Sequence, residues 1–189
     1  SRLWENIIEK SRGYWKFFVP RLREKFPENL SRCSLDDFFR ALNRVMPSFT
    51  RIEADELTYN LHILLRYELE IDVLEHRLRV ADLPAAWNLK MNEYLSLVPS
   101  NDAQGVLQDV HWSNGLIGYF PTYTLGNLIS AQIFEKATKL QPEILSSIEN
   151  GEFLPLLQWL RTNIHWHGRK FTSQEILKRT TGESLQPSY

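Results

Sequence analysis

The residues best suited to chemistry lie between residues 109 and 127, in the stretch DVHWSNGLIGYFPTYTLGN. This stretch combines one His, one Asp and two Tyr with three Gly, a mixture that neither an ordinary surface loop nor a buried helix needs. Pro121 suits the first position of a helix, where its missing N–H is no loss. The pattern therefore predicts a glycine-rich turn that leads into a helix. Tyr119 then stands at the helix entry and Tyr123 one turn in, with His111 brought near by the turn.

Two interpretations of this stretch remain open from the spacing alone. In the first, the phenols of Tyr119 and Tyr123 point with the His111 ring into one cavity and hold a polar or anionic ligand. In the second, the tyrosines hydrogen-bond locally at an ordinarily packed helix start, as buried tyrosines commonly do. The second outcome is the commoner one, so the stretch by itself marks a candidate site without defining its chemistry.

Arg51 is the second residue whose position suggests chemistry. The letters TRIE at residues 50–53 have the pattern of a capping box and predict a long helix that reaches about residue 76. Arg51 then falls in the first turn, where the helix dipole disfavours cations although the exposed N–H groups favour anions. It is either a solvated charge, the commoner case, or an anion receptor that shares a cleft with the two tyrosines and His111.

The same predicted helix carries one polar line on otherwise apolar faces. Asp55, Tyr59, His62, Arg66 and Glu70 recur at three- and four-residue steps, and leucines fill much of the other faces. A helix of this kind is usually buried, with its polar line turned to water or to a cleft.

The elements that must position these residues are helices. Strand signals are almost absent, whereas helical periodicity and helix-start signals recur along the whole chain. Predicted helices begin near residues 2, 34, 50, 83, 121, 142, 153 and 172. The fold class is therefore all-α, and residues 1–189 are expected to form a single helical domain.

The bulk composition bounds the class of protein. With 43% hydrophobic and 24% charged residues, the 189-residue chain can bury a sizeable core. Its 22 Lys and Arg nearly balance its 23 Asp and Glu, so nothing points to nucleic acid or a membrane surface as a partner. The single cysteine, Cys33, excludes an intrachain disulfide and a cysteine-based zinc site. These features, with no apolar run of transmembrane length, fit a cytoplasmic protein.

The five histidines do not form a metal-binding motif. None lies in HExxH, in which two His one helical turn apart hold zinc. His165 and His167 are two residues apart, which would turn their rings to different faces of a helix. The letters HGRK from His167 onward are better explained as a helix end with basic residues at the negative pole of its dipole. No metal ligand is therefore expected in this chain, and no nucleophile motif or phosphate-binding glycine loop is present.

Four stretches together resemble the thermostable carboxypeptidase Taq family of zinc metallocarboxypeptidases. They follow the family's order and span nearly the whole chain: SRLWENIIEKSRGYW, RIEADELTYNLHILLRYELE, GVLQDVHWSNGLIGYFPTYTLGNLISAQ and NIHWHGRKFTSQEILKRTTGE. The resemblance implies a cytoplasmic, often homodimeric hydrolase that removes C-terminal residues from peptides with a free carboxylate. It places the chain as a multi-helix lobe of a larger, mostly helical HExxH-type metallopeptidase fold.

The zinc-binding residues of that family are not found in this chain. The family holds zinc with two His of HExxH and a Glu of a later His-Glu-Ser motif, which lies just before the residues that match SRLWEN. The resemblance therefore implies that residues 1–189 are a C-terminal fragment, inactive by itself. The cofactor, zinc or another divalent metal, would be held by the missing N-terminal portion, and this chain alone is expected to bind none.

The same resemblance implies roles for the candidate residues. The family's arginine motif matches residues 51–55, so Arg51 is expected to bind the terminal carboxylate of the peptide. The family's cleft tyrosine falls in GYFPTY, where Tyr123 is favoured for both substrate binding and catalysis, with Tyr119 beside it. A tyrosine hydroxyl, with His111 helping, is expected to stabilise the tetrahedral oxyanion.

A hypothesis of a different class is that the chain is a non-catalytic helical binding or interaction domain that reuses the same fold. An HExxH and a His-Glu-Ser motif upstream of residue 1 would decide for the enzyme.

In either case Trp4, Trp15 and Phe18 make the first predicted helix too aromatic to stay uncovered. We therefore expect self-association or contact with the missing portion.

Overall fold

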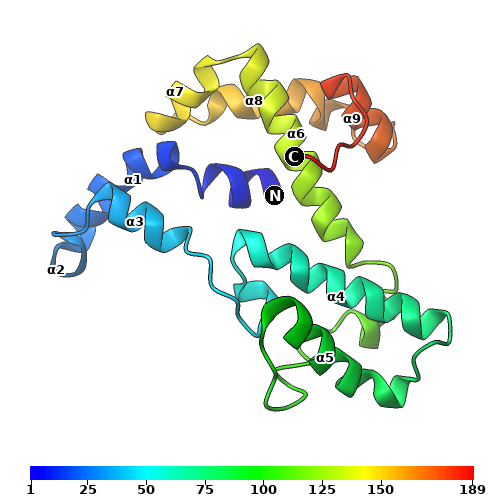
Figure 1. The fold of residues 1–189 in the computed structure, drawn as a ribbon. Helices are drawn as coiled ribbons and strands as arrows, with labels where there is room; N and C mark the ends of the chain where they lie inside the picture. Colours follow the sequence, from blue (N-terminus) through cyan, green and yellow to red (C-terminus); the bar gives the residue numbers. More distant parts are fainter. The chain divides into compact units, whose positions relative to one another are not determined.

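The computed structural model describes residues 1–189 and contains helices but no strand (Figure 1). The all-α prediction is therefore confirmed. Contacts within the chain divide it into two compact units. Unit 1 contains residues 1–42 and 126–189, and unit 2 contains residues 43–125. That the two units act as the single domain expected over residues 1–189 stays a prediction.

Unit 1 is built around helix α1, which packs against α7, α2 and α3. Its elements are the π-helical η1 (Leu3–Ile8), α1 (Arg12–Lys25), α2 (Pro27–Leu30), α3 (Leu35–Leu42), α6 (Pro121–Leu140) from Gly126 onward, α7 (Glu143–Glu149), α8 (Leu154–Asn163), the 3₁₀ turn η5 (His165–His167) and α9 (Ser173–Thr181). Two predicted capping boxes are confirmed. Ser34 and Asp37 exchange hydrogen bonds of 3.0 and 3.1 Å before α3, and Thr172 and Glu175 form the same pair before α9.

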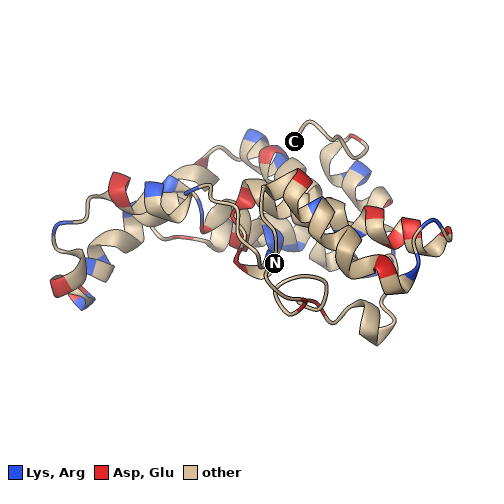
Figure 2. Ribbon diagram, turned by 60° about the horizontal axis from the view of Figure 1, so that its bottom comes forward, with Lys and Arg blue, Asp and Glu red and all other residues tan.

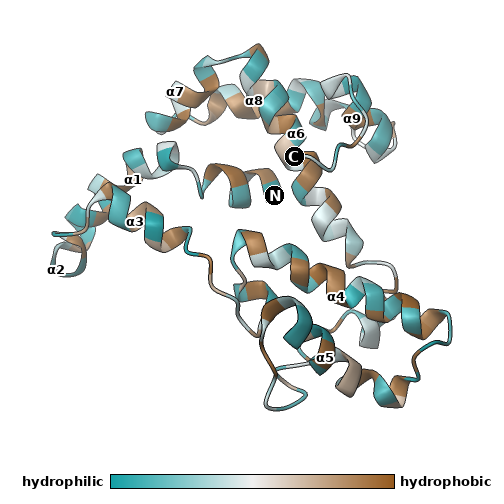
Figure 3. Cartoon of the chain, in the orientation of Figure 1, coloured by the Kyte–Doolittle hydropathy of each residue, from teal (hydrophilic) through white to brown (hydrophobic).

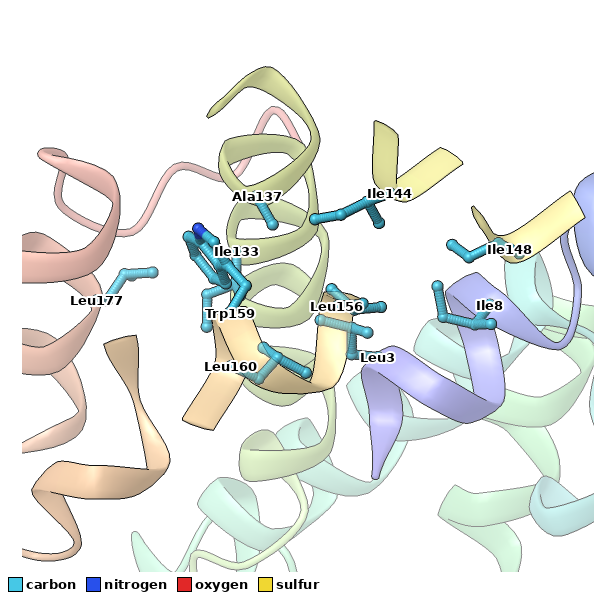
Figure 4. Packing of buried hydrophobic residues seen from close by; sticks show 10 residues of the cluster. All are labelled: Leu3, Ile8, Ile133, Ala137, Ile144, Ile148, Leu156, Trp159, Leu160 and Leu177. Atoms are coloured by element: carbon cyan, nitrogen blue, oxygen red, sulfur yellow. The ribbon is translucent and has the colours of Figure 1, made fainter. Parts of the chain in front are cut away.

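Apolar side chains from five elements meet in the core of unit 1 (Figure 4). They are Leu3 and Ile8 of η1, Ile133 and Ala137 of α6, Ile144 and Ile148 of α7, Leu156, Trp159 and Leu160 of α8, and Leu177 of α9. The aromatic rings of the first predicted helix are half-buried in the same unit. Phe18 stacks on Phe153, and Trp15 packs against Phe38. Unit 1 therefore covers part of the aromatic surface that we expected self-association or the missing portion to cover.

The helix predicted to begin near residue 2 is divided into η1 and α1. The hydroxyl of Ser11 accepts a hydrogen bond of 3.2 Å from the N–H of Tyr14, so an N-cap starts a new helix there. Pro20 lies inside α1, which continues to Lys25, so the helix does not stop at this proline. Burial of the neighbouring Val19 and the packing of α1 on α7 outweigh the single helix hydrogen bond that proline removes.

Unit 2 is built around α4, which packs side by side with α5 (Figure 1). Its elements are the 3₁₀ turn η2 (Arg51–Glu53), α4 (Glu56–Leu74), the 3₁₀ turn η3 (Val80–Asp82), α5 (Leu83–Leu95), the 3₁₀ turn η4 (Trp112–Asn114) and the first turn of α6. Apolar residues recur along α4 and α5 (Figure 3). One buried cluster joins the two helices through Leu65, Leu69, Trp87, Met91 and Leu95, and a second contains Tyr59, Ile63 and Phe120.

The long helix of unit 2 begins at Glu56, later than the TRIE pattern predicts. Thr50 makes no capping hydrogen bond, and residues 51–53 form the separate turn η2. Asp55 caps α4 instead, because one of its oxygens accepts the N–H groups of Leu57 and Thr58, both at 2.9 Å. The capping box expected at residues 50–53 is therefore wrong, and Arg51 lies before the helix rather than in its first turn.

Charged residues of both signs are interspersed along the helices (Figure 2). None of the helices is both long and apolar enough to span a bilayer.

Candidate active site

The polar line of α4 faces the interior of unit 2. Tyr59, His62, Arg66 and Glu70 are all buried, and the side chains of His62 and Arg66 have no exposed surface. The segment from residue 104 to residue 123 packs against this line and supplies its partners. The alternative in which the line faces water is therefore wrong for these four residues.

Asp109 holds two buried arginines at once. Its Oδ1 accepts a hydrogen bond of 2.6 Å from Nη2 of Arg51, and its Oδ2 accepts one of 2.7 Å from Nε of Arg66. The side chain of Arg51 is 7% exposed and that of Arg66 is 0% exposed. Because two guanidinium groups share one carboxylate, this trio carries a net charge of +1. A buried group with unbalanced positive charge favours an anion as its further partner.

The pKa values of this trio follow from burial and mutual attraction. Burial raises the pKa of Asp109, but the hydrogen bonds and charges of Arg51 and Arg66 outweigh it and hold that pKa below its usual value. Burial lowers the pKa of Arg66 to about 10, against the attraction of Asp109. Burial also lowers the pKa of Arg51, yet Asp109 and Tyr59 more than offset the effect and the pKa is raised. All three groups are therefore charged at neutral pH.

Gln108 fixes the backbone around the trio. Its Oε1 accepts from the backbone N–H of Arg51 at 3.0 Å and from Nη2 of Arg66 at 2.8 Å. Its Nε2 donates to the carbonyl oxygens of Phe49 and Gln104, both at 3.0 Å. The four hydrogen bonds of this one amide link η2, helix α4 and the loop after α5 that contains Gln104 in a single arrangement.

The guanidinium of Arg51 has more N–H donors than these contacts use. Its Nε and Nη2 donate to Asp109, and its Nη1 donates to the hydroxyl of Tyr59 at 2.9 Å. One N–H on each Nη nitrogen is left over from the five donors of a guanidinium group. An arginine with free N–H donors can bind a carboxylate through both oxygens. The guanidinium carbon also lies 4.9 Å from the centre of the Tyr123 ring.

His111 and Tyr123 form a hydrogen-bonded pair beside Arg51. Nε2 of His111 lies 3.0 Å from the hydroxyl of Tyr123, so the prediction that the glycine turn brings them together is confirmed. The His111 ring also packs on the rings of Phe120 and Tyr119, with centroid distances of 4.4 and 5.4 Å. Burial lowers the pKa of His111, and burial raises the pKa of Tyr123. At neutral pH the pair therefore consists of a neutral imidazole and a protonated phenol.

The structure brings the candidate residues together. Tyr123 contacts both Arg51 and His111. The ring of Tyr119 lies 5.5 Å from that of Tyr123, and Tyr119 is 42% exposed. The interpretation of Arg51 as a solvated charge is wrong, because it is buried in an ion pair. Tyr123 finds its partner His111 twelve residues away in the same stretch. Their roles in a reaction stay predictions.

Sequence reasoning did not assign Asp109, Gln108, Arg66 or Tyr59 to the site. A signal was present for the last two, since both belong to the polar line of α4. A line of buried polar groups must find partners elsewhere in the chain, and the adjacent letters QD in the aromatic stretch were the available partners.

The residues of this site do not fit a resident divalent metal. No group of three or more His, Cys, Asp or Glu side chains that could hold a metal ion occurs in the chain. The one carboxylate at the centre, Asp109, is already bound by two guanidinium groups that would repel a divalent cation. His165 and His167, whose spacing the sequence analysis judged unsuited to a metal pair, lie in η5 of unit 1.

The fold and the site together define an all-α protein with a buried cationic cluster suited to an anion. The chain belongs to the carboxypeptidase Taq (M32) metallopeptidase family, whose model matches residues 1–189. The resemblance drawn from the four sequence stretches is thereby confirmed.

Individual relatives support the same assignment. Thermostable carboxypeptidase 1 of Thermus thermophilus is 48% identical over 184 residues, which are 97% of this chain and 36% of that protein. Carboxypeptidase 1 of Bacillus subtilis is 44% identical over 189 residues, which are 100% of this chain and 38% of that protein. The crystal structure of an M32 carboxypeptidase from Deinococcus radiodurans matches with a TM-score of 0.94 and 41% identity, covering 98% of this chain and 37% of that one. The chain thus spans little more than a third of the proteins it matches.

Proposed function

We propose that residues 1–189 are the C-terminal part of a metallocarboxypeptidase and supply the substrate-carboxylate and oxyanion side of its active site. The observation that carries this proposal is the contact of Arg51, Tyr123 and His111 in a chain of this family. The metal that the family name implies, with zinc as our expectation, would be held by residues outside this chain. A cytoplasmic homodimer and inactivity of the 189 residues alone belong to the same proposal.

Arg51 is proposed to bind the terminal carboxylate of the peptide. The trio of Arg51, Arg66 and Asp109 has one positive charge in excess, and arginine is suited to bind both oxygens of a carboxylate. Asp109 holds the guanidinium and Gln108 holds the backbone of Arg51 before the ligand arrives, so little side-chain entropy is lost on binding.

Tyr123 is proposed to donate a hydrogen bond to the oxyanion that forms at the scissile carbonyl. Its raised pKa keeps the phenol protonated, so the hydroxyl has a proton to donate. The neutral His111 ring at 3.0 Å orients that hydroxyl through the tautomer whose Nε2–H donates to the phenol oxygen, which leaves the phenol proton for the oxyanion. The Tyr119 ring packs against the imidazole. A donor aimed at developing negative charge acts mainly in the transition state.

Tyr123→Phe in the intact enzyme that carries these residues tests the proposal. We expect kcat to fall on the order of a hundredfold for every peptide substrate, because one oxyanion donor is lost, with a small change in KM. Tyr94→Phe is the matched control, since the Tyr94 hydroxyl also makes a side-chain hydrogen bond in unit 2 but to Glu68, outside the site. An unchanged kcat in Tyr123→Phe would refute the catalytic role, and an intact protein without peptidase activity would favour the non-catalytic binding domain.

A further inference from the structure

Glu70 is a buried charged residue to which the proposed function gives no role. It lies on α4 one turn beyond Arg66 and is 6% exposed. Its Oε2 accepts a hydrogen bond of 2.7 Å from Nε1 of Trp112, and its Oε1 accepts one of 2.6 Å from the backbone N–H of Gly118. Both donors belong to the aromatic turn that carries the candidate site. A buried carboxylate that is bound only by neutral donors needs each of them.

The two donors flank the residues proposed to act on the substrate. Trp112 directly follows His111, and Gly118 directly precedes Tyr119. Between them the chain turns back on itself, because the carbonyl oxygen of His111 accepts the N–H of Leu116 at 2.9 Å. Glu70 therefore links both ends of one turn to the rigid helix α4.

The conformation of this turn depends on such an anchor. Gly115 and Gly118 have φ angles of 71° and 74°. Glycine populates positive and negative φ about equally, so the residues themselves do not fix this conformation. Trp112 packs edge to face on Trp87 and on Phe120, so its indole is held by its ring as well as by its N–H. At Gly118 the backbone N–H bond to Glu70 is the contact that fixes the peptide plane before Tyr119.

We propose that Glu70 is a positioning residue that holds His111 and Tyr119 in register with Tyr123 for the reaction. This inference rests on the proposed function of His111 and Tyr123. A carboxylate is required because it offers one acceptor oxygen to each donor, whereas an amide of the same shape turns an NH₂ group toward one of them. Loss of one bond would free one end of the turn and let the His111–Tyr123 contact of 3.0 Å lengthen.

The decisive variant is Glu70→Gln, with Glu68→Gln as its matched control. Glu68 also lies on α4 and also binds two donors, Lys90 at 2.5 Å and the Tyr94 hydroxyl at 2.6 Å, but neither belongs to the aromatic turn. In the intact enzyme, kcat should fall about tenfold to a hundredfold in Glu70→Gln, with KM nearly unchanged, because the reacting groups are misplaced rather than lost. Glu68→Gln should keep the kcat of the wild type. Equal losses in both variants, or no loss in Glu70→Gln, would overturn the proposal.

A second arm uses nuclear magnetic resonance on the 189-residue chain and needs no activity. The Gly118 amide proton should lie far downfield and exchange slowly, and both features should be lost in Glu70→Gln and kept in Glu68→Gln. If Glu70→Gln does not fold, Trp112→Phe removes the other hydrogen bond while keeping an aromatic ring, and kcat should again fall. A Gly118 amide that exchanges freely in the wild type would overturn the anchor itself. If the Gly118 amide is downfield and exchanges slowly as expected, but Tyr123→Phe leaves the kcat of the intact enzyme unchanged, the failure lies in the proposed function and not in the anchor.

Discussion

At the scale of single residues, the site is centred on two buried arginines that share one aspartate. Asp109 balances one of the two cations, and under our proposal the other is left to the carboxylate of the ligand. The residues proposed to act on the substrate, Arg51, His111 and the two tyrosines, were visible in the sequence. The partner Asp109 could not be assigned, because an ion pair between residues 58 positions apart leaves no periodic signal.

Asp109→Asn should strongly destabilise unit 2, because it leaves two buried guanidinium groups without a counter-charge. We expect the free energy of unfolding to fall by about 3–5 kcal/mol. Asp72→Asn is the control, since its pair with Arg77 is half exposed and should contribute less than about 1 kcal/mol. Urea denaturation of the full chain followed by circular dichroism measures both. Equal effects of the two substitutions would show that the Asp109 pairs contribute no more than a surface ion pair.

His62 should make stability depend on pH. Burial, with the charges of Arg66 and Arg51, lowers the pKa of His62 from 6.5 to about 4, and the Ser48 backbone and Asp109 oppose the shift more weakly. The unfolded chain therefore takes up a proton near pH 6.5 while the folded chain takes it up only near pH 4. Between these values the unfolded state binds more protons, so stability falls as the pH falls, by roughly 3 kcal/mol at most.

Denaturation curves at pH 7, 6, 5 and 4.5 measure this loss. His62→Gln, which does not titrate, should show a smaller loss of unfolding free energy over the same range than the wild type. Identical pH dependence in the two proteins would mean that His62 is accessible to protons in the folded state.

At the scale of elements, the helix pattern was predictable wherever local chemistry decided it. The capping boxes at residues 34–37 and 172–175 formed as expected, because each cap and its partner lie within one turn. The start of α4 was not predictable in the same way. TRIE and the later Asp55 offer two competing starts, and the hydrogen bonds from the backbone N–H of Arg51 to Gln108 and from its side chain to Asp109 decide between them. Those partners come from a distant segment, which local patterns do not include.

The competition between the two helix starts can be measured directly. Asp55→Ala should lower the free energy of unfolding by about 1–2 kcal/mol, because the N–H groups of Leu57 and Thr58 lose their acceptor. Thr50→Ala should have an effect within about 0.5 kcal/mol, since its side chain caps nothing. Thermal and urea unfolding of the two variants would contradict this account if Thr50→Ala were the more damaging one.

At the scale of the whole molecule, the all-α class followed from periodicity and from the lack of strand signals, and the family followed from stretches spread along the chain. The division into two units did not follow, because no linker composition separates them: unit 1 is assembled from residues 1–42 and 126–189, and α6 begins in one unit and continues in the other. The chain spans 36–38% of the curated relatives it matches.

The central claim is that Arg51 binds the terminal carboxylate of a peptide, and one ratio tests it most directly. In the intact enzyme that carries this chain, kcat/KM is measured for a peptide with a free C-terminal carboxylate and for the same peptide with an amidated C-terminus. Both are measured for the wild type and for Arg51→Gln. Because each preparation is used with both peptides, any loss of folded protein lowers both values equally and cancels in the ratio.

The loss of a charged contact of roughly 2–4 kcal/mol predicts that Arg51→Gln lowers kcat/KM for the free-carboxylate peptide on the order of thirtyfold to a thousandfold. The value for the amidated peptide, which offers no charge to Arg51, should fall far less, so the preference for the free carboxylate should collapse. A preference that stays at its wild-type value would contradict the account, since Arg51 would then be a structural partner of Asp109 and nothing more.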